Sequence, residues 1–378
     1  MWPKQDLMDL LEIELPIIQA PMAGANDSTM AIAVSEAGGL GSLPCGMLDV
    51  ETASAEMGVI RQSTAKPYNV NFLCHDYEAL SPSEEKSWQL HLQKYYEELD
   101  IDITAPLPGA SRNPFSEEMC SLVERHRPNV VSFHFGLPEK TLLDRVKEAG
   151  CTVLSSATTV EEAVWLEAHG CDAIIAQGYE AGGHRGNFLS SDVATQPGTL
   201  ALVPQVVDAV SIPIIAAGGI ADGRGVAAAF ALGAAGVQIG TAYLHTPESL
   251  VSDLHRQALQ GASDNKTALT NLFSGKPARG LMNRLMEELG PMSDQVTAFP
   301  YAGGALAPLK AVAEKNGRTD FTSLWAGQSA GIDHGLDAAG LTRQLVADAQ
   351  ERFRALQPES LYPEALQPEE MNPEATSP

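Results

Sequence analysis

Two histidines are the residues of this sequence best suited to acid–base chemistry. His184 lies in "AQGYEAGGHRGNFLS" (176–190), where four glycines surround it directly after an apolar run, and His134 closes another apolar run in "SFHFG". Imidazole changes protonation state near neutral pH, so either side chain suits proton transfer or binding of an anionic substrate. A lone histidine is more often structural, so a function is indicated only if the fold brings both together.

Two glycine-containing turns suit the binding of an anion. Gly218 and Gly219 follow one apolar run, and Gly240 and Thr241 end another. Glycine lets backbone N–H groups approach a phosphate closely, and the threonine hydroxyl adds a donor. Either turn alone is an ordinary connection, but both together favour a phosphate site. We predict no metal site, because neither histidine has a metal-binding spacing.

The elements that must position these residues repeat as an apolar run, an amphipathic stretch and a glycine. The apolar runs are near-continuous, as strands buried on both faces of a parallel sheet are. Gly150, Gly170 and Gly233 fall where a left-handed residue would end a helix. Eight such units predict an α/β fold, the (β/α)8 TIM barrel, in preference to an open doubly wound sheet. The predicted strands are 16–22, 40–46, 68–74, 129–136, 152–157, 172–178, 212–219 and 236–241, and three of the predicted helices are 139–150, 159–170 and 225–236.

A first insertion interrupts the barrel core, which we place at residues 1–241. It occupies 76–115 and contains a helical pattern in which Trp88, Leu92 and Tyr95 are spaced to share one apolar face. We therefore expect an inserted helical segment within the barrel unit.

The region after the eighth strand, 242–356, is predicted to be mostly helical. It supplies the final barrel helix and a C-terminal helical lobe over the barrel mouth. From 357 to 378, Pro-Glu pairs recur every five residues without an apolar face, which predicts a disordered Pro/Glu-rich tail.

Charge and cysteine usage limit the class of partner. The 378 residues include 48 Asp and Glu against 24 Lys and Arg, a net charge of −24 that opposes binding to nucleic acid or to anionic membranes. Five cysteines without a C-x-x-C pair indicate neither a disulfide framework nor a zinc site. No signal peptide or membrane-spanning run is evident, so we expect a cytoplasmic protein acting on a small molecule, with its oligomeric state open.

Several motifs together resemble one family. "PIIQAPMAG", "VNFLC", "VVSFHFGLP", "AQGYEAGGHRG", "IPIIAAGGIADG", "VQIGT" and "LWAGQSAG" are similar to motifs of the FMN-dependent nitronate monooxygenases, formerly grouped as 2-nitropropane dioxygenases. The resemblance covers roughly residues 13–330. It implies FMN at the barrel mouth, bound by Ala20, Pro21, Met22, Asn71, Gln177, Gly182, Gly183, Gly218, Gly219, Gly240 and Thr241.

The resemblance also implies an oxidation of alkyl nitronates, or of nitroalkanes, by O₂ to a carbonyl compound and nitrite. His184 would act at the reactive face of the flavin, and His134 would help to hold the substrate. In "TAFPYAGGALAPLK" (297–310) the chain departs from the family pattern, and Tyr301 is the substrate-side candidate there. The alternative is an NAD(P)H-dependent flavin reductase of the same superfamily, an enoyl-acyl-carrier-protein or quinone reductase. A remoter alternative is a non-catalytic scaffold with an interacting tail.

Overall fold

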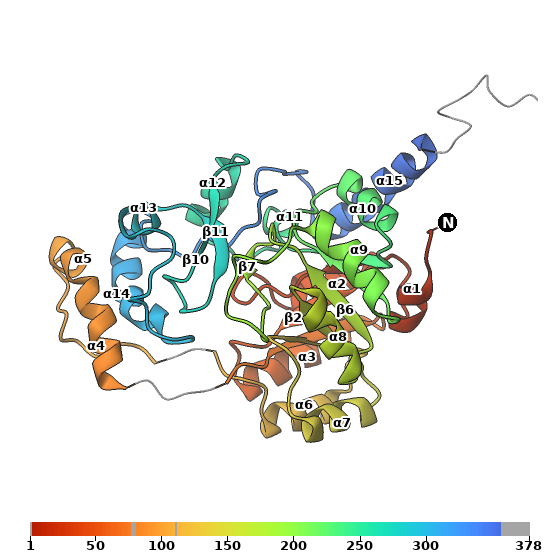
Figure 1. Ribbon diagram of the computed structural model, residues 1–378, viewed down its shortest axis with the longest axis horizontal. Helices are drawn as coiled ribbons and strands as arrows, with labels where there is room; N and C mark the ends of the chain where they lie inside the picture. The colour runs from red at the N-terminus through yellow and green to blue at the C-terminus, as the bar shows by residue number, and fades with distance from the viewer. Residues whose placement is uncertain (1, 77–80, 110–111, 357–378) are drawn as a thin grey trace, which may run out of the picture.

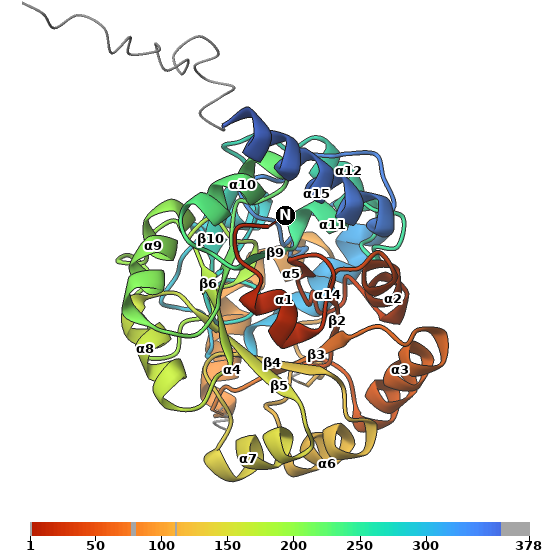
Figure 2. The same ribbon diagram turned by 90° about the vertical axis from the view of Figure 1, so that its right-hand side faces the viewer.

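Eight parallel strands form the centre of the fold, and each is followed by an outer helix (Figures 1 and 2). The computed structural model describes residues 2–76, 81–109 and 112–356, so the predicted tail, 357–378, lies outside the described residues. The strands are β1 (Ile17–Gln19), β2 (Gly41–Pro44), β3 (Tyr68–Leu73), β4 (Val130–His134), β5 (Thr152–Ala157), β6 (Ala173–Gln177), β8 (Ile214–Ala217) and β9 (Gly236–Ile239).

The strands close into a barrel. Their hydrogen-bonded order is β1-β9-β8-β6-β5-β4-β3-β2, and every neighbouring pair is parallel. Leu40 joins the two ends, because its N–H donates to Ile17 O at 2.9 Å and its carbonyl accepts from Gln19 N at 3.0 Å. The predicted TIM barrel is thus confirmed. Residues that follow parallel strands meet at one rim of such a barrel.

The outer helices surround the strands, as Figure 2 shows. In chain order they are α2 (Ser28–Glu36), α3 (Val50–Ser63), α6 (Glu117–His126), α7 (Lys140–Glu148), α8 (Val160–Ala168), α9 (Thr199–Ala209), α10 (Gly223–Ala231) and α15 (Ala338–Ala355), with α1 (Asp6–Leu11) before the first strand. Within the described part of the chain, none of the helices combines the length and apolar character needed to cross a bilayer.

Glycines end several of these helices as the sequence predicts. Gly150, Gly170 and Gly233 have φ of 89°, 95° and 96°, the left-handed region that glycine adopts at little cost. One boundary differs from the prediction: α10 starts at 223 and not at 225. The carboxylate of Asp222 caps it by accepting hydrogen bonds from the N–H groups of its first turn.

Polar side chains fill part of the barrel interior. Asn69 donates from Nδ2 to Ser42 Oγ at 3.0 Å and to Ser132 Oγ at 2.9 Å, and Ser42 N donates to Gln19 Oε1 at 2.9 Å. All four residues are at most 1% exposed. These bonds link β1 to β4 inside the barrel and help to fix their register, although Oδ1 of Asn69 stays buried without a partner among the described residues. Asn71, two residues along β3, extends the network to the rim with a 3.0 Å bond to Ser132 Oγ.

The region after β9 contains strands that the prediction of a mostly helical lobe missed. β10 (Thr267–Thr270) pairs with β11 (Ala278–Leu281), and β11 pairs with β7 (Gly183–His184) from the loop after β6, all antiparallel. The helices of this region are α11 (Thr241–Leu244), α12 (Asp253–Gln260), α13 (Arg284–Leu289) and α14 (Ala302–Lys315). The lobe is therefore joined by backbone pairing to the loop that follows β6 at the barrel rim.

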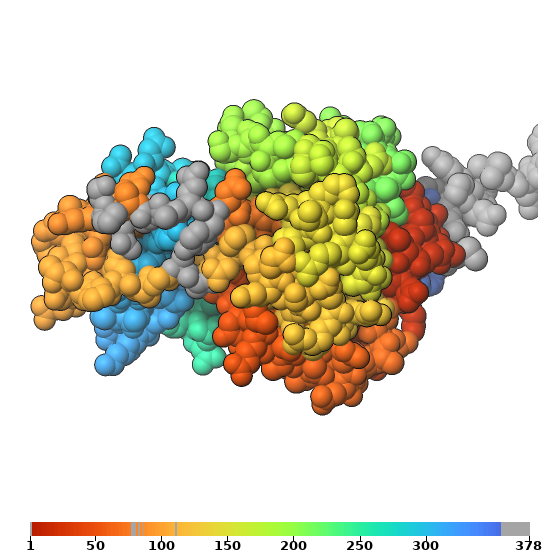
Figure 3. All heavy atoms as spheres, turned by 90° about the horizontal axis from the view of Figure 1, so that it is seen from below, coloured from red at the N-terminus to blue at the C-terminus, as the bar shows by residue number. Residues whose placement is uncertain are grey.

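The first insertion packs on this lobe. Its predicted helix is broken at Leu92 into α4 (Pro82–His91) and α5 (Gln93–Glu98). Trp88, Leu92 and Tyr95 are at most 1% exposed and share one hydrophobic cluster with Leu309 of α14. The space-filling view shows the inserted residues and α14 at one end of the molecule, with the barrel at the other (Figure 3). The insertion, predicted as part of the barrel unit, therefore has its core contacts in the lobe.

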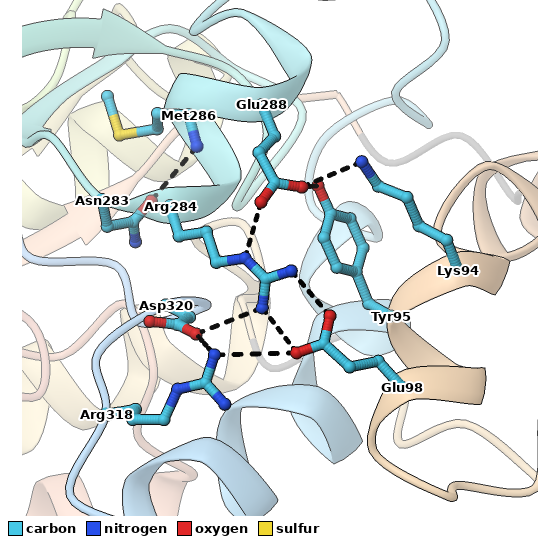
Figure 4. Close-up of polar contacts among 9 residues, drawn as sticks. All are labelled: Lys94, Tyr95, Glu98, Asn283, Arg284, Met286, Glu288, Arg318 and Asp320. Carbon is cyan, nitrogen blue, oxygen red and sulfur yellow. Dashed lines mark hydrogen bonds and ion pairs between the residues drawn. The ribbon is translucent and has the colours of Figure 1, made fainter.

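An ion-pair network fastens α5 to α13 (Figure 4). Arg284 donates to both carboxylate oxygens of Glu98, at 2.7 and 2.6 Å, and to Glu288 at 2.6 Å. Asp320 lies 3.6 Å from Arg284 and also pairs with Arg318. Partly exposed pairs contribute little individually, but bidentate geometry within a network fixes orientation.

Candidate active site

A cavity of about 590 Å³ lies at the carboxyl ends of the barrel strands. The barrel contributes the residues after its strands, and the lobe contributes Phe299 and Trp325. Tyr301 is not part of the wall; it stands at the start of α14. The other residues predicted for the flavin or for catalysis all line the cavity: Ala20, Pro21, Met22, Asn71, His134, Gln177, Gly182, Gly183, His184, Gly218, Gly219, Gly240 and Thr241.

One end of the cavity is a cradle of glycine backbone. Gly218 and Gly219 have φ of +112° and +71°, which other residues rarely adopt. A Cβ atom added at Gly240 would make only ordinary contacts with the protein. Because Gly240 lacks this atom, the cavity wall is open at that point. Thr241 Oγ1 accepts a hydrogen bond from Gly327 N at 2.9 Å, which leaves the hydroxyl proton for an anion.

The carboxylates beside this cradle are already engaged. Glu180 accepts hydrogen bonds from Thr199 N at 2.8 Å and Thr199 Oγ1 at 2.9 Å, at the start of α9. Asp222 accepts from the N–H groups of Arg224 and Gly225 and so occupies the start of α10. Both acids lie at helix N-termini, where the helix dipole stabilises their charge. Donors for a phosphate must therefore come from the glycine turns and not from the first turn of α10.

His134 uses both ring nitrogens within the protein. Nε2 lies 3.3 Å from the carbonyl oxygen of His184, and Nδ1 lies 2.6 Å from Ser156 Oγ. A carbonyl can only accept, so Nε2 carries the proton and Nδ1 accepts from the serine. Burial lowers the pKa of His134 to about 4, so the ring is neutral at physiological pH.

His184 lies in β7 and not in the open loop that the glycines suggest. Its Nε2 is 2.9 Å from Ser274 Oγ. Phe299 and Trp325, each 5.5 Å away by ring centroids, and Phe135, at 6.1 Å, surround it. The imidazole therefore faces the cavity from an aromatic wall, and its position is fixed by strand pairing.

Electrostatics keep His184 neutral. Burial lowers its pKa well below 6.5, and the nearby positive charge of Arg112 and Lys276 lowers it further. Lys276 stands 4.7 Å above the ring of Phe135, a favourable cation–π position. The cavity wall thus combines a neutral imidazole with the guanidinium of Arg112, and the ammonium group of Lys276 lies nearby. In the described part of the chain, no group of three or more His, Cys, Asp or Glu side chains could hold a metal ion.

Two predicted cofactor residues also have structural partners. Gln177 donates from Nε2 to His184 O at 3.0 Å and accepts from Gly186 N at 2.8 Å, so its amide shapes the loop that carries His184. Asn71 donates to Ser132, whereas its Oδ1 has no partner among the described residues. Asn71 therefore keeps an acceptor for a ligand, and Gln177 serves mainly to order the loop.

Sequence reasoning missed several residues of this site. Gln238, a polar residue within the apolar run of β9, has its Oε1 buried without a partner beside the cavity. Its position inside an otherwise apolar strand was the available signal. Trp325 belongs to the motif "LWAGQSAG", but the motif alone assigns it no role. The sequence around Ser274 and Arg112 contains no pattern that indicates a site.

Comparisons with known proteins support one family. The family model described as nitronate monooxygenase matches residues 4–348. A nitronate monooxygenase of Pseudomonas aeruginosa is 41% identical over 90% of this chain and 97% of its own length, and a probable nitronate monooxygenase of Staphylococcus aureus is 38% identical over 87% and 92%. The chain belongs to the nitronate monooxygenase family.

Solved structures agree with this assignment. The nitroalkane oxidase of Streptomyces ansochromogenes superposes with a TM-score of 0.85 at 37% identity, covering 93% of this chain and 100% of that one. FabK of Thermotoga maritima superposes with a TM-score of 0.70 at 31% identity, covering 94% and 99%. As a nitronate monooxygenase family member, the protein is an oxidoreductase of a flavin-dependent family.

The residues present fit a flavin. The unpaired Oε1 of Gln238 and Oδ1 of Asn71 are acceptors that suit the N–H groups of a flavin ring. Glycine turns at the other end give a phosphate close access to backbone donors, and Gly183 has no atom within 4 Å of where a side chain would begin. This nitronate monooxygenase family member therefore has acceptors that suit a flavin ring and backbone donors that suit its phosphate.

Proposed function

We propose that the protein binds FMN in this cavity and oxidises alkyl nitronates, or the corresponding nitroalkanes, with O₂ to a carbonyl compound and nitrite. The observation that carries the proposal is the meeting of the glycine cradle, His184 and Arg112 at one cavity on the barrel rim. Family membership supports the same reaction class.

The barrel residues would hold the cofactor. The backbone of residues 20–22, Asn71 and Gln238 would contact the ring, and Gly218, Gly219, Gly240 and Thr241 the ribityl-phosphate end. When bound, FMN supplies the electron transfer between nitronate and O₂. The chain's own residues bind and orient the substrate, exclude water and move the proton.

His184 is assigned the proton-handling role. In a neutral nitroalkane the bond from the α-carbon to hydrogen breaks, its electrons remain as the C=N bond of the nitronate, and the proton passes to the imidazole. Arg112, which lines the cavity, would stabilise the negative charge that forms on the nitro oxygens, and the positive charge of Lys276 nearby would add to this effect. A preformed nitronate has already lost this proton, so it needs only the stabilisation of its negative charge.

His134 is assigned a positioning role. Both of its nitrogens are bonded within the protein, and it holds the backbone of His184, so we revise its predicted part as a substrate ligand. Phe299 takes the substrate-side place expected for Tyr301, because it lines the cavity against His184. Together with Trp325 it would keep water from the reacting carbon.

Anaerobic mixing of the purified protein with single reductants tests the proposal. We expect bound FMN to be bleached by ethylnitronate and not by NADH or NADPH, and aerobic turnover to release nitrite and aldehyde in equal amounts. Bleaching by NAD(P)H alone would overturn the proposal in favour of the reductase alternative. A colourless protein that does not take up added FMN would favour the scaffold alternative.

A further inference from the structure

Ser274 lies beneath the imidazole of His184 in the turn between β10 and β11. Its side chain has no exposed surface, and Gly275, with φ of +91°, closes the turn by donating its N–H to Asn271 O at 2.8 Å. A side chain at Gly275 would meet the Phe299 backbone at 2.5 Å, so the turn is packed tightly against the cavity wall. The serine oxygen is therefore held at a fixed place.

The hydrogen bonds of Ser274 Oγ determine where the protons lie. Its one proton has two possible acceptors, the carbonyl oxygen of Lys276 at 3.1 Å and Nε2 of His184 at 2.9 Å; it also accepts from Lys276 N at 3.4 Å. If the proton goes to the carbonyl, Nε2–H of His184 donates to Oγ and every group is paired. If it goes to Nε2 instead, the Lys276 carbonyl loses this partner.

The second nitrogen of His184 is left for the cavity. Nδ1 makes no hydrogen bond among the described residues, and the ring itself lines the cavity. The tautomer set at Nε2 therefore decides whether the cavity receives a lone pair or an N–H group.

We propose that Ser274 is a positioning residue that holds His184 as the Nε2–H tautomer, so that Nδ1 presents its lone pair to the substrate. This deepens the proposed function and rests on it for its kinetic consequence. A lone pair accepts the proton of a neutral nitroalkane but offers no hydrogen bond to the oxygens of an anionic nitronate. Ser274 thus equips the site for neutral nitroalkanes in addition to nitronates.

A spectroscopic experiment tests the tautomer without turnover. In the FMN-loaded protein labelled with ¹⁵N-histidine, long-range ¹H–¹⁵N spectra distinguish protonated from unprotonated ring nitrogens, and His184→Asn identifies the signals of His184. We expect a protonated Nε2 and an unprotonated Nδ1, and a mixture of tautomers in Ser274→Ala. A protonated Nδ1 in the unmodified protein would overturn the proposal even if Ser274→Ala does not fold. An unchanged spectrum in a folded Ser274→Ala would do so as well.

Kinetics supply the second arm. Ser274→Ala should lower kcat for neutral nitroethane about 10- to 100-fold, with KM and the rate on preformed ethylnitronate nearly unchanged, since a wrong tautomer removes the base and not the binding site. Ser274→Thr keeps the hydroxyl and should restore most of the loss. Equal losses on both substrate forms, or no rescue by Ser274→Thr when that variant is folded, would count against the proposal.

A matched control variant distinguishes an effect on the His184 tautomer from the loss of stability that removal of any buried serine hydroxyl would cause. Ser35 on α2 is also unexposed, donates to a backbone carbonyl, Pro67 O, at 2.8 Å, and does not line the cavity. Ser35→Ala should lower stability without altering the His184 spectrum or the ratio of nitroethane to ethylnitronate rates. If neither substrate form is oxidised by any variant, the proposed function fails while the spectra still decide the tautomer.

Discussion

His134 donates a hydrogen bond from Nε2 to the backbone carbonyl of His184 across 3.3 Å. Its Nδ1 accepts from Ser156, so no nitrogen of this ring is left for a substrate. Of the two histidines that the sequence indicates, His134 therefore supports the backbone of the loop that carries His184. The two histidines meet because β4 and β6 end at the same rim, and the loop after β6 folds back over His134.

His134→Phe tests this division of roles. The variant keeps an aromatic ring, somewhat larger than imidazole, but loses both hydrogen bonds, so we expect FMN to be retained and kcat on nitroethane to fall about 10-fold through misplacement of His184. Because His134 acts through His184, the double variant with His184→Asn should be no slower than His184→Asn alone. Multiplied losses in the double variant would instead show an independent catalytic role.

His184→Asn should separate the two substrate forms. Asparagine cannot accept the proton, so kcat on nitroethane should fall about 10²- to 10⁴-fold, the usual contribution of a general base. Preformed ethylnitronate should lose much less, and FMN content should stay unchanged. Steady-state rates at equal flavin occupancy measure both, and equal losses would assign the residue to substrate positioning only.

Gly240→Ala tests the phosphate cradle with little effect on folding. Its φ of −112° suits alanine, and the added methyl would meet only Ala20 Cβ at 3.5 Å and Met22 Sδ at 3.6 Å, ordinary contacts. Standing on the cavity wall, the methyl should obstruct the cofactor and raise the Kd for FMN about 10-fold or more, about 1.4 kcal/mol. Fluorescence titration of the apoprotein measures it.

Gly58→Ala is the matched control for this change. Gly58 lies in α3 with no atom within 4 Å of the added methyl, so alanine should stabilise the helix by about 0.5–1 kcal/mol and leave FMN affinity unchanged. An unaltered FMN affinity in Gly240→Ala would remove Gly240 from the phosphate site.

Sequence patterns predicted the barrel and its rim because both follow from short segments of the chain. Strands buried on both faces leave apolar runs such as 152–157 and 172–178, and glycines such as Gly170 mark the helix ends between them. Once the barrel is inferred, its parallel topology alone brings the residues after each strand to one cavity. For this reason the predicted cofactor residues line it together.

The remaining part of the site depends on pairing between distant segments. β7 has two residues and β11 reads "ARGL", so neither carries a strand pattern, yet Ala278 pairs with His184 and brings Ser274 beneath it. Phe299 and Tyr301 are two residues apart, yet only Phe299 lines the cavity, while Tyr301 stands at the start of α14. No local signal distinguishes such alternatives.

Buried histidines should make the protein acid-sensitive. Burial lowers the pKa of His255 to about 4, against about 6.5 when unfolded, and the pKa of His75 and His134 to about 4 as well. The unfolded chain therefore binds protons first as pH falls, so the stability from these groups is complete above pH 6.5 and is lost between 6.5 and about 4. The free energy of unfolding should fall between pH 7 and 5.

His255→Leu should reduce that slope. The Nε2 of His255 is buried without a partner on α12, and removing the group takes away one titration, worth up to about 1.4 kcal/mol per pH unit. Urea unfolding of the FMN-loaded protein at pH 7, 6 and 5 measures the slope. Identical slopes in the variant and the unmodified protein would show that His255 is not one of the responsible groups.

Trp88 should connect the inserted helices to substrate binding. It is 1% exposed, donates from Nε1 to Ala302 O at 3.1 Å, and packs in the lobe cluster beside α14. Trp88→Ala removes a large buried ring, which typically costs about 3–5 kcal/mol, and should loosen α14 and with it Phe299 at the cavity wall. We expect a raised KM for nitroethane with FMN retained, because the cofactor residues belong to the barrel. Trp88→Phe keeps a buried aromatic ring but loses the hydrogen bond, worth about 1 kcal/mol, and part of the ring volume, so its KM should rise less than that of Trp88→Ala. Loss of FMN in Trp88→Ala, measured by flavin absorbance after gel filtration, would contradict this separation, because it would show that the lobe supports the cofactor as well as the substrate.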